Sequence, residues 1–267
     1  MNNMIKNKIA VILLLLFFLN SSGQSTENTR PRKEFRVNLE TIMYQKLMET
    51  PKNDNTLFHS KDAPSGILSI STYYRLKNNF AIEPSFGFTI IPYNYNYNIE
   101  LDPSHPMYKN GSVVSHSSYE FALPSLKIGL LGFKEFPLKN KFNILTGLGI
   151  NWNIYPTYIF DSGVAYGLND NQPDSSFRLF NLTLEDEGHS TAFWSDFTYS
   201  AKIGLSNRNN KGNGYCISLV FNFQPNKIGV GNYFFDLGTH KETGSLKWKN
   251  SYYGFCFSKT FNRDKKE

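Results

Sequence analysis

The chain has 267 residues, of which 40% are hydrophobic, 16% aromatic and 19% charged, and its formal net charge is +6. The positive charge is scattered and is not gathered into a basic stripe interleaved with aromatics, so we expect no nucleic-acid binding. Beyond the N-terminal residues, no segment is apolar and long enough for a transmembrane helix, which excludes a helical membrane protein.

The N-terminus has the three parts of a secretory signal peptide. A short basic start precedes the apolar run IAVILLLLFFL and the small residues Ser21-Ser22-Gly23. We therefore expect cleavage after Gly23, so that residues 1–23 are removed. A retained N-terminal anchor is the alternative, but the apolar run is short for a membrane span. Residues 24–34 are polar and basic and are interpreted as a periplasmic linker.

From residue 35 onward, apolar and polar residues alternate with a period of two, which is typical of strands whose two faces meet different environments. The clearest case is Phe80–Pro92, FAIEPSFGFTIIP. Only three residues separate it from the preceding strand at 68–76, so the two strands are expected to form a tight hairpin. A first strand is predicted at 35–43, followed by a polar loop at 46–65.

The same alternation predicts five further strands. One begins at Tyr119, and its apolar phase shifts at Pro124-Ser125, where we expect a β-bulge. The remaining four are predicted at 142–154, 193–205, 215–223 and 253–261.

Three long segments between these strands are predicted to be loops, at 93–118, 156–192 and 225–244. The first of them contains a YNYNYN repeat, which could instead extend the preceding strand with aromatics on one face. The turns between the other strands are short. Long and short connections therefore alternate along the whole chain.

Eight strands with this rhythm predict an all-β fold, namely an eight-stranded antiparallel up-and-down transmembrane β-barrel. The barrel would cover residues 35–261, with short periplasmic turns, long extracellular loops and a polar C-terminal tail at 262–267. An even number of strands lets the last one close against the first and leaves no open edge.

A soluble barrel of the lipocalin type is the alternative, because it has a similar number of strands. In the membrane barrel, the polar faces line the lumen, where charges of both signs must pair because isolated buried charges are costly. The predicted lumen charges are Arg36, Glu40, Arg75, Glu83, Glu120, Lys127, Asp196 and Lys202. For Glu83 we expect Arg75 as the partner across the hairpin.

Aromatic residues near the strand ends favour the membrane barrel, because such barrels carry aromatic girdles at both membrane interfaces. The residues in question are Tyr74, Phe80, Tyr119, Trp152, Tyr155, Phe193, Tyr199, Tyr215 and Tyr253.

Four segments of the chain resemble the outer-membrane β-barrel domain of bacteroidete envelope proteins, the broad PorT-like group. They are SSGQS at the end of the signal peptide, YRLKNNFAIEPSFGFT, YEFALPSLKIG with its mid-strand proline, and the aromatic last strand. The resemblance implies an accessory role in protein export or envelope assembly and brings no catalytic residues. The tail after Phe261 departs from barrels that end on an aromatic.

The two cysteines, Cys216 and Cys256, fall on the last two strands in the inward-facing phase. A hairpin that pairs Gln224 near Trp248 would place them opposite each other, so a disulfide is possible. Two inward-facing thiols that do not bond are the alternative, which we favour.

Loop residues offer only weak signals for chemistry. His116 lies between Ser115 and Ser117, but no Ser-His-acid arrangement can be assigned by spacing. The acidic residues of the 156–192 loop, including Asp170, Asp174 and 185–187, could bind Ca²⁺, but their spacing lacks the pattern of a calcium-binding loop. We therefore expect no catalytic residues, no metal and no cofactor.

The sequence predicts a non-enzymatic protein of the bacterial outer membrane, a scaffold that presents extracellular loops for binding or envelope integrity. Alternatives are the export accessory factor and a lipid A-modifying enzyme. The expected partners are outer-membrane lipid and lipopolysaccharide, the barrel-assembly machinery and an unknown extracellular ligand.

Overall fold

The computed structural model describes residues 33–46, 48–50, 57–105, 113–138, 142–156, 159–165, 178–185, 193–208, 213–236 and 241–261. The expected signal peptide and the C-terminal tail lie outside these residues. The first strand begins at Lys33, two residues earlier than the sequence predicts. Glu34, predicted to lie in the linker, is therefore part of the barrel wall.

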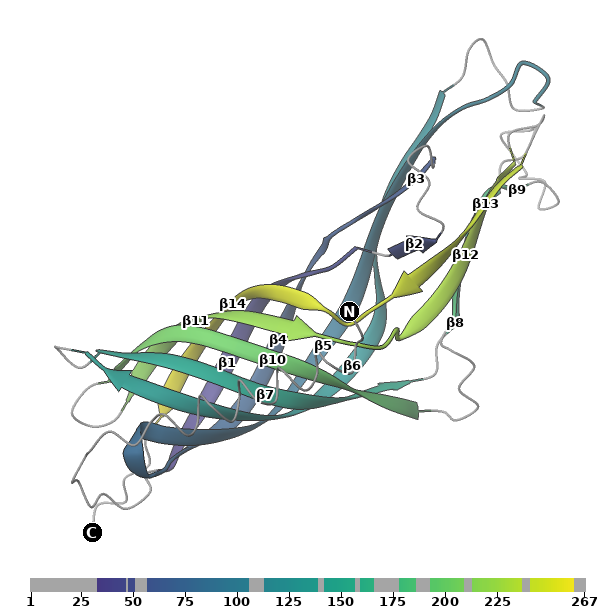
Figure 1. Cartoon of the computed structure of the whole chain (residues 1–267). Coiled ribbons are helices and arrows are strands. Elements are labelled where there is room, and N and C mark those ends of the chain that lie inside the picture. The colour runs from purple at the N-terminus through teal and green to yellow at the C-terminus, as the bar shows by residue number, and fades with distance from the viewer. Residues whose placement is uncertain are drawn as a thin grey trace, which may run out of the picture.

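Eight long strands form a closed barrel in which every neighbouring pair is antiparallel, as predicted (Figure 1). The last strand pairs with the first and so closes the wall. In wall order the strands are β1 (Lys33–Tyr44), β4 (Ala63–Arg75), β5 (Phe80–Glu100), β6 (Val113–Pro137), β7 (Phe142–Pro156), β10 (Phe193–Arg208), β11 (Gly214–Phe223) and β14 (Tyr252–Phe261).

The two ends of the barrel differ in their connections. At one end, short turns join β4 to β5, β6 to β7 and β10 to β11. The first of these turns contains η1 (Lys77–Asn79), in which Asn78 and Asn79 have φ of 59° and 60°, a conformation that asparagine tolerates well. We call this end the turn end and the opposite one the loop end.

Beyond the loop end, the chain continues into a second layer of strands, which the sequence predicted to be loops. A five-stranded sheet contains β2 (Met48–Thr50), β13 (Lys241–Trp248), β12 (Gly229–Asp236), β9 (Arg178–Glu185) and β8 (Ile159–Ala165). Facing it are β3 (Phe58–Lys61) and the distal parts of β5 and β6, which run well past the barrel (Figure 1). We call these strands together, with residues 92–100 of β5 and 113–122 of β6, the head.

The prediction of four long loops was therefore wrong in this part of the chain. The strands that were missed have only three to eight residues. Sequences such as GVGNYFFD of β12 and KETGSLKW of β13 do not alternate cleanly between apolar and polar residues, so the period of two is absent from them. The suggestion that YNYNYN extends its strand is confirmed, because β5 continues to Glu100.

The predicted bulge lies two residues away from its expected place. Ile91 pairs with Leu123 and Pro92 with Phe121, so Ala122 is the extra residue of β6. Pro124 itself pairs normally with Ile90. The change of apolar phase in the sequence was real, but the proline next to it did not cause it.

The main hydrophobic core of the molecule lies in the head and at the loop end of the barrel, not along the barrel axis. A smaller cluster near the turn end contains Tyr73, Ala81, Leu131, Phe133, Leu145 and Cys216. Within the described residues, no helix is long and apolar enough to cross a membrane.

Candidate functional site: barrel lumen and head

The outer surface of the barrel is apolar around its circumference. Leu68 is 60% exposed, Phe255 59% and Ile217 58%. Such exposure would be unfavourable in water over so large an area. Each strand carries these side chains on alternate positions, and β11 alternates without a break over its ten residues.

The strand β5 shows where this apolar outer surface ends. Up to Ile90 its outward-facing residues are apolar and its inward-facing residues small or polar, with Phe88 47% exposed. Beyond Pro92 the two faces exchange character, so that Tyr95 points inward and is 1% exposed, while asparagines point outward. One continuous strand therefore passes from an apolar to an aqueous environment at residues 90–92.

The length of this apolar stretch suits a membrane. The outward apolar positions of β5 run from Phe80 to Ile90, and these ten steps of roughly 3.3 Å extend for about 33 Å. At a strand tilt of about 40°, the stretch covers a thickness close to the roughly 25 Å apolar band of outer-membrane barrels.

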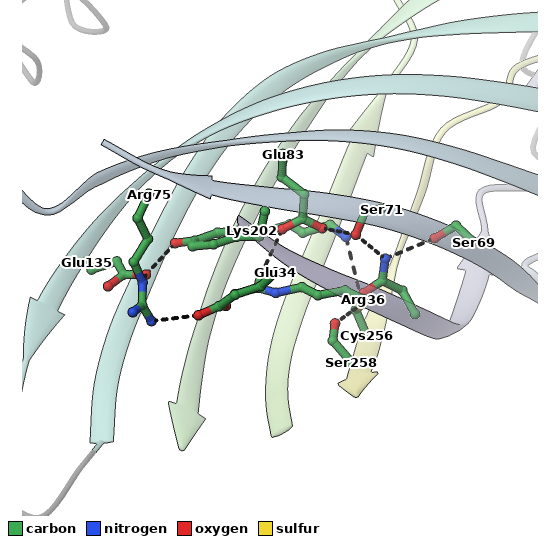
Figure 2. A network of polar contacts seen from close by, with 12 residues as sticks. Glu34, Arg36, Ser69, Ser71, Arg75, Glu83, Glu135, Lys202, Cys256 and Ser258 are labelled. Atoms are coloured by element: carbon green, nitrogen blue, oxygen red, sulfur yellow. Dashed lines mark hydrogen bonds and ion pairs between the residues drawn. The ribbon is translucent and has the colours of Figure 1, made fainter. Parts of the chain in front are cut away.

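A cluster of charged side chains fills the lumen near the turn end (Figure 2). Arg36 donates to Glu83, with 2.9 Å between Nη1 and Oε2, and Ser71 donates to the other oxygen of Glu83 at 2.8 Å. Arg75 pairs with Glu34 at 3.3 Å and with Glu135 at 3.4 Å. The predicted partner of Glu83 was therefore wrong, because Arg75 lies closer to the turn end and pairs with carboxylates there.

The guanidinium of Arg36 is also held by an aromatic ring. Its central carbon lies 3.6 Å from the ring centroid of Tyr73, a cation–π contact. The Tyr73 hydroxyl in turn donates to Glu135 at 2.6 Å, so the ring connects the two ion pairs. Arg36 is 2% exposed and Glu83 4%, so the network is desolvated. Removing one of its charges would strongly lower the free energy of unfolding, because the partner charge would then be buried alone.

A second set of charges lies in the middle of the lumen. Lys202 donates to Glu40 at 2.7 Å, and its ammonium lies 3.7 Å from the sulfur of Cys256. Lys127 donates to the hydroxyl of Tyr252. Glu40, Lys127 and Lys202 all lie on the lumen side of the wall, where they line the same cavity.

Nearer the loop end, uncharged amides and hydroxyls replace the ion pairs. Asn151 donates to Ser200 at 2.5 Å and to Asn222 at 3.1 Å. Above them, Asn250 donates to the hydroxyl of Tyr155 at 2.8 Å. These side chains come from β7, β10, β11 and the segment before β14, so they bridge the lumen.

A small polar cavity between the middle and the amide layers measures about 10 Å³, about the room that one water needs. Asn38, Glu83, Lys127, Asn151 and Lys202 are among its lining residues. The interior of an eight-stranded barrel is just wide enough for side chains. Packing at this level therefore closes the lumen.

Two other predicted lumen charges have different outcomes. Asp196 lies at the loop end of β10 and accepts a hydrogen bond at 2.7 Å from the side-chain amide of Gln224, so this contact is made with an amide and not with a cation. Glu120 lies on β6 opposite Tyr93, but its side chain is outside the described residues.

The predicted aromatic girdle is correct for most of its members. Trp152, Tyr199, Tyr215 and Tyr253 are exposed on the outer surface of the barrel, whereas Tyr119 is exposed on the outward face of the head, opposite Asn94. Tyr155 is the exception, because it is fully buried in phase with Asn151 and Asn153, which face the lumen. The side chain of Phe193 is outside the described residues.

Both cysteines point into the lumen, as predicted, and both are free thiols. The predicted register was wrong by two residues, since Cys216 pairs with Ser258 and Cys256 with Ser218. Residues diagonal to each other across two strands are about 7–8 Å apart. A disulfide usually needs Cα atoms within about 4.4–6.8 Å.

The head is held together by aromatic rings from its two layers. Phe58 stacks on Tyr95 of β5 with centroids 5.4 Å apart and on Tyr233 of β12 at 4.8 Å. Tyr97 meets Phe235 edge-on at 5.2 Å, and Tyr93 meets Trp248 at 6.0 Å. The head is therefore a packed two-layer unit with its own core.

Most of the residues behind the weak loop signals lie outside the described part of the chain. Ser115 donates to Asn98 at 2.7 Å, while the side chain of the neighbouring His116 is outside the described residues. Asp170 and Asp174 are outside them too. Among the residues that the structure describes, no group of three potential metal ligands comes together.

A closed antiparallel barrel with an apolar outer band and a polar, occluded lumen defines a transmembrane β-barrel. Among solved structures, the chain is similar to the outer membrane protein OprG from Pseudomonas aeruginosa, with 12% identity, 87% of this chain and 98% of that chain covered, and a TM-score of 0.42. It is also similar to Neisserial surface protein A, with 12% identity, 84% and 95% coverage and a TM-score of 0.31.

No protein-family model and no curated protein matches the chain. Similarities to solved structures at this level are too low to transfer a function. The fold assignment rests on the strand pairing and the surface of this chain itself.

Proposed function

We propose that this chain is a non-enzymatic protein of the bacterial outer membrane, in which the closed barrel anchors the head outside the cell as a binding surface. The observation that supports this most is the exchange of faces along β5 at residues 90–92. A strand that leaves lipid and continues directly into the head couples the head rigidly to the barrel. The turn end then faces the periplasm, where short turns belong.

The outward face of the head supports a role in binding. Asn94, Asn96 and Asn98 of β5 point outward and pair across to Tyr119, Ser117 and Ser115 of β6. Amides and hydroxyls in such rows offer both donors and acceptors. This face lies directly above the apolar band, where the saccharides and phosphates of lipopolysaccharide or an extracellular ligand would meet it.

Cysteine labelling on intact cells tests the orientation. Cys216→Ser and Cys256→Ser provide a background without native thiols, to which either Asn98→Cys on the head or Asn207→Cys at the turn end is added. A membrane-impermeant maleimide should label the first and spare the second until the cells are lysed. Labelling of Asn207→Cys alone on intact cells would reverse the proposed orientation.

The binding role needs a separate test. An Asn94→Ala/Asn96→Ala/Asn98→Ala variant should still fold, so that its unboiled and boiled samples migrate differently on a gel. It should nevertheless fail to restore the envelope phenotype of a deletion strain. The control is Leu68→Val, a change at an exposed lipid-facing residue. This variant should restore the phenotype. Full restoration by the asparagine variant would contradict a role for this face.

An accessory role in protein export or envelope assembly is the second proposal. It is supported by the PorT-like resemblance of residues 74–89 and 119–129, which form parts of β4, β5 and β6. Loss of secreted proteins from the medium of a deletion strain, with lipid composition unchanged, would favour it over a surface-binding role. A lipid A-modifying enzyme would instead require altered lipid A acylation that depends on His116.

A further inference from the structure

Three lysines lie on the outer surface of the turn end, each directly across from an aromatic residue on the neighbouring strand. Lys33 pairs with Tyr74, Lys134 with Phe80 and Lys259 with Tyr215. In all three cases the ammonium lies over the ring, at 5.6, 4.1 and 3.6 Å from its centroid.

These pairs form a connected arc around the barrel. Their strands follow one another in the order β11, β14, β1, β4, β5 and β6. Between the pairs, Phe35 and Phe261 meet with ring centroids 6.4 Å apart, so the arc is apolar where it is not cationic. We call these three lysines and their paired rings the turn-end arc.

Strand alternation separates the charges at this end by sign. Lys33 is followed by Glu34 and Lys134 by Glu135, and both glutamates turn into the lumen, where Arg75 binds them. Among the described residues, the outer surface of the turn end carries no carboxylate. Within the described part of this surface, the positive charge of the lysines is therefore not balanced by an outward-facing carboxylate.

The position of the arc identifies its surroundings. It borders the apolar outer band, at the level where hydrocarbon gives way to lipid headgroups. A lysine there keeps its stem in the apolar layer and its ammonium at the headgroups. Lys134 also donates to the backbone carbonyl of Asn78 at 2.8 Å, and Lys259 donates to the hydroxyl of Tyr215. These acceptors are uncharged, so the positive charge of both ammonium groups is not neutralised by them.

We propose that the turn-end arc binds the phosphate groups of anionic phospholipids in the leaflet around the turn end. The headgroup phosphate supplies the negative charge that no outward side chain of the described turn end provides. Charge attraction of this kind is worth roughly a fivefold preference for anionic lipid per lysine near the surface. This goes beyond the proposed role of the head and involves the opposite end of the barrel.

Native mass spectrometry from nanodiscs tests the proposal. The full chain is placed in an equimolar mixture of phosphatidylcholine and phosphatidylglycerol, and the ratio of the two lipids that remain bound is measured. We expect several-fold enrichment of phosphatidylglycerol on the unmodified chain, falling to the bulk ratio in the Lys33→Gln/Lys134→Gln/Lys259→Gln variant. Raising the salt concentration should lower the enrichment of the unmodified chain.

Two further variants make the result specific. The change of the same three lysines to arginine keeps the charge and should keep the enrichment. The matched control is Lys46→Gln/Lys61→Gln/Lys247→Gln, three exposed lysines toward the loop end, and it should also keep it. Unchanged enrichment in the turn-end glutamine variant, with its folded migration intact, would overturn the proposal, as would an equal loss in the control.

Discussion

Arg36 and Glu83 form a buried ion pair across the barrel lumen, although β4 lies between their strands β1 and β5. The 2.9 Å contact is supported by the Tyr73 ring on one side and by Ser71 on the other. It joins three consecutive strands through their side chains in addition to the backbone ladder. The pair thereby links the wall on both sides of β4.

Arg36→Met should lower the free energy of unfolding by about 3–5 kcal/mol, because the Glu83 carboxylate is then buried without its cation. The measurement is urea unfolding in lipid vesicles, followed by tryptophan fluorescence. Arg75→Met should cost less, because the Arg75 side chain is 25% exposed and water can replace part of its contacts. The double change Arg36→Met/Glu83→Gln should recover part of the loss, and no recovery would show that the pair is not the cause.

Gly254→Ala should destabilise the seam where the first and last strands meet. An added Cβ at Gly254 would lie 2.1 Å from the carbonyl oxygen of Thr41, a backbone atom that cannot move without breaking the β1–β14 ladder. Overpacking of this kind costs about 1–3 kcal/mol. The temperature at which the folded band disappears from an unboiled gel series should therefore fall.

Gly66→Ala provides the control for this change, since the nearest atom to its added Cβ lies 3.4 Å away. It should shift that temperature little. Equal shifts in the two variants would mean that backbone entropy, not the close approach at Thr41, governs the effect.

The barrel could be predicted from the sequence because lipid imposes a period of two on every strand. Phe80–Pro92 shows this best, since each outward position up to Ile90 is apolar and each inward one small or polar. The lumen-facing positions of Arg36, Glu40 and Lys202 followed from the same alternation. Their partners did not follow, because the pairing across the lumen depends on strand tilt and register.

The head was missed because its pattern inverts at the membrane boundary. Tyr93, Tyr95 and Tyr97 continue the alternation of β5, but their apolar face is now the inner one. The alternation that is typical of a lipid-facing strand therefore ends at Pro92. The signal that could have found the head is the YNYNYN repeat itself, because alternating tyrosine and asparagine predicts a sheet with one buried aromatic face.

Phe58→Ala should loosen the head without unfolding the barrel. The Phe58 ring is sandwiched between Tyr95 of one layer and Tyr233 of the other, and it is fully buried. Loss of a buried phenylalanine costs about 3–5 kcal/mol. Protease added to whole cells should cut the variant in the head, while the barrel fragment keeps its heat-modifiable migration.

The neighbouring His59→Ala is the control for Phe58, because His59 is exposed on the opposite face of β3 and should leave the protease pattern unchanged. If Phe58→Ala also abolished the folded migration, the head and the barrel would unfold as one unit.

The register of β11 and β14 predicts which cysteine pair can be oxidised. Cys216 lies directly opposite Ser258, and directly paired residues in antiparallel strands are about 4.5–5.5 Å apart at Cα, within disulfide range. In a Cys256→Ser background, Ser258→Cys should therefore form a disulfide with Cys216 under mild oxidation.

The natural pair Cys216 and Cys256, diagonal across the strands, should remain reduced in the folded barrel under the same conditions. Intact mass measured before and after oxidation distinguishes the two. A disulfide in the natural pair, with none in the engineered one, would show that the two strands are paired two residues away from this register.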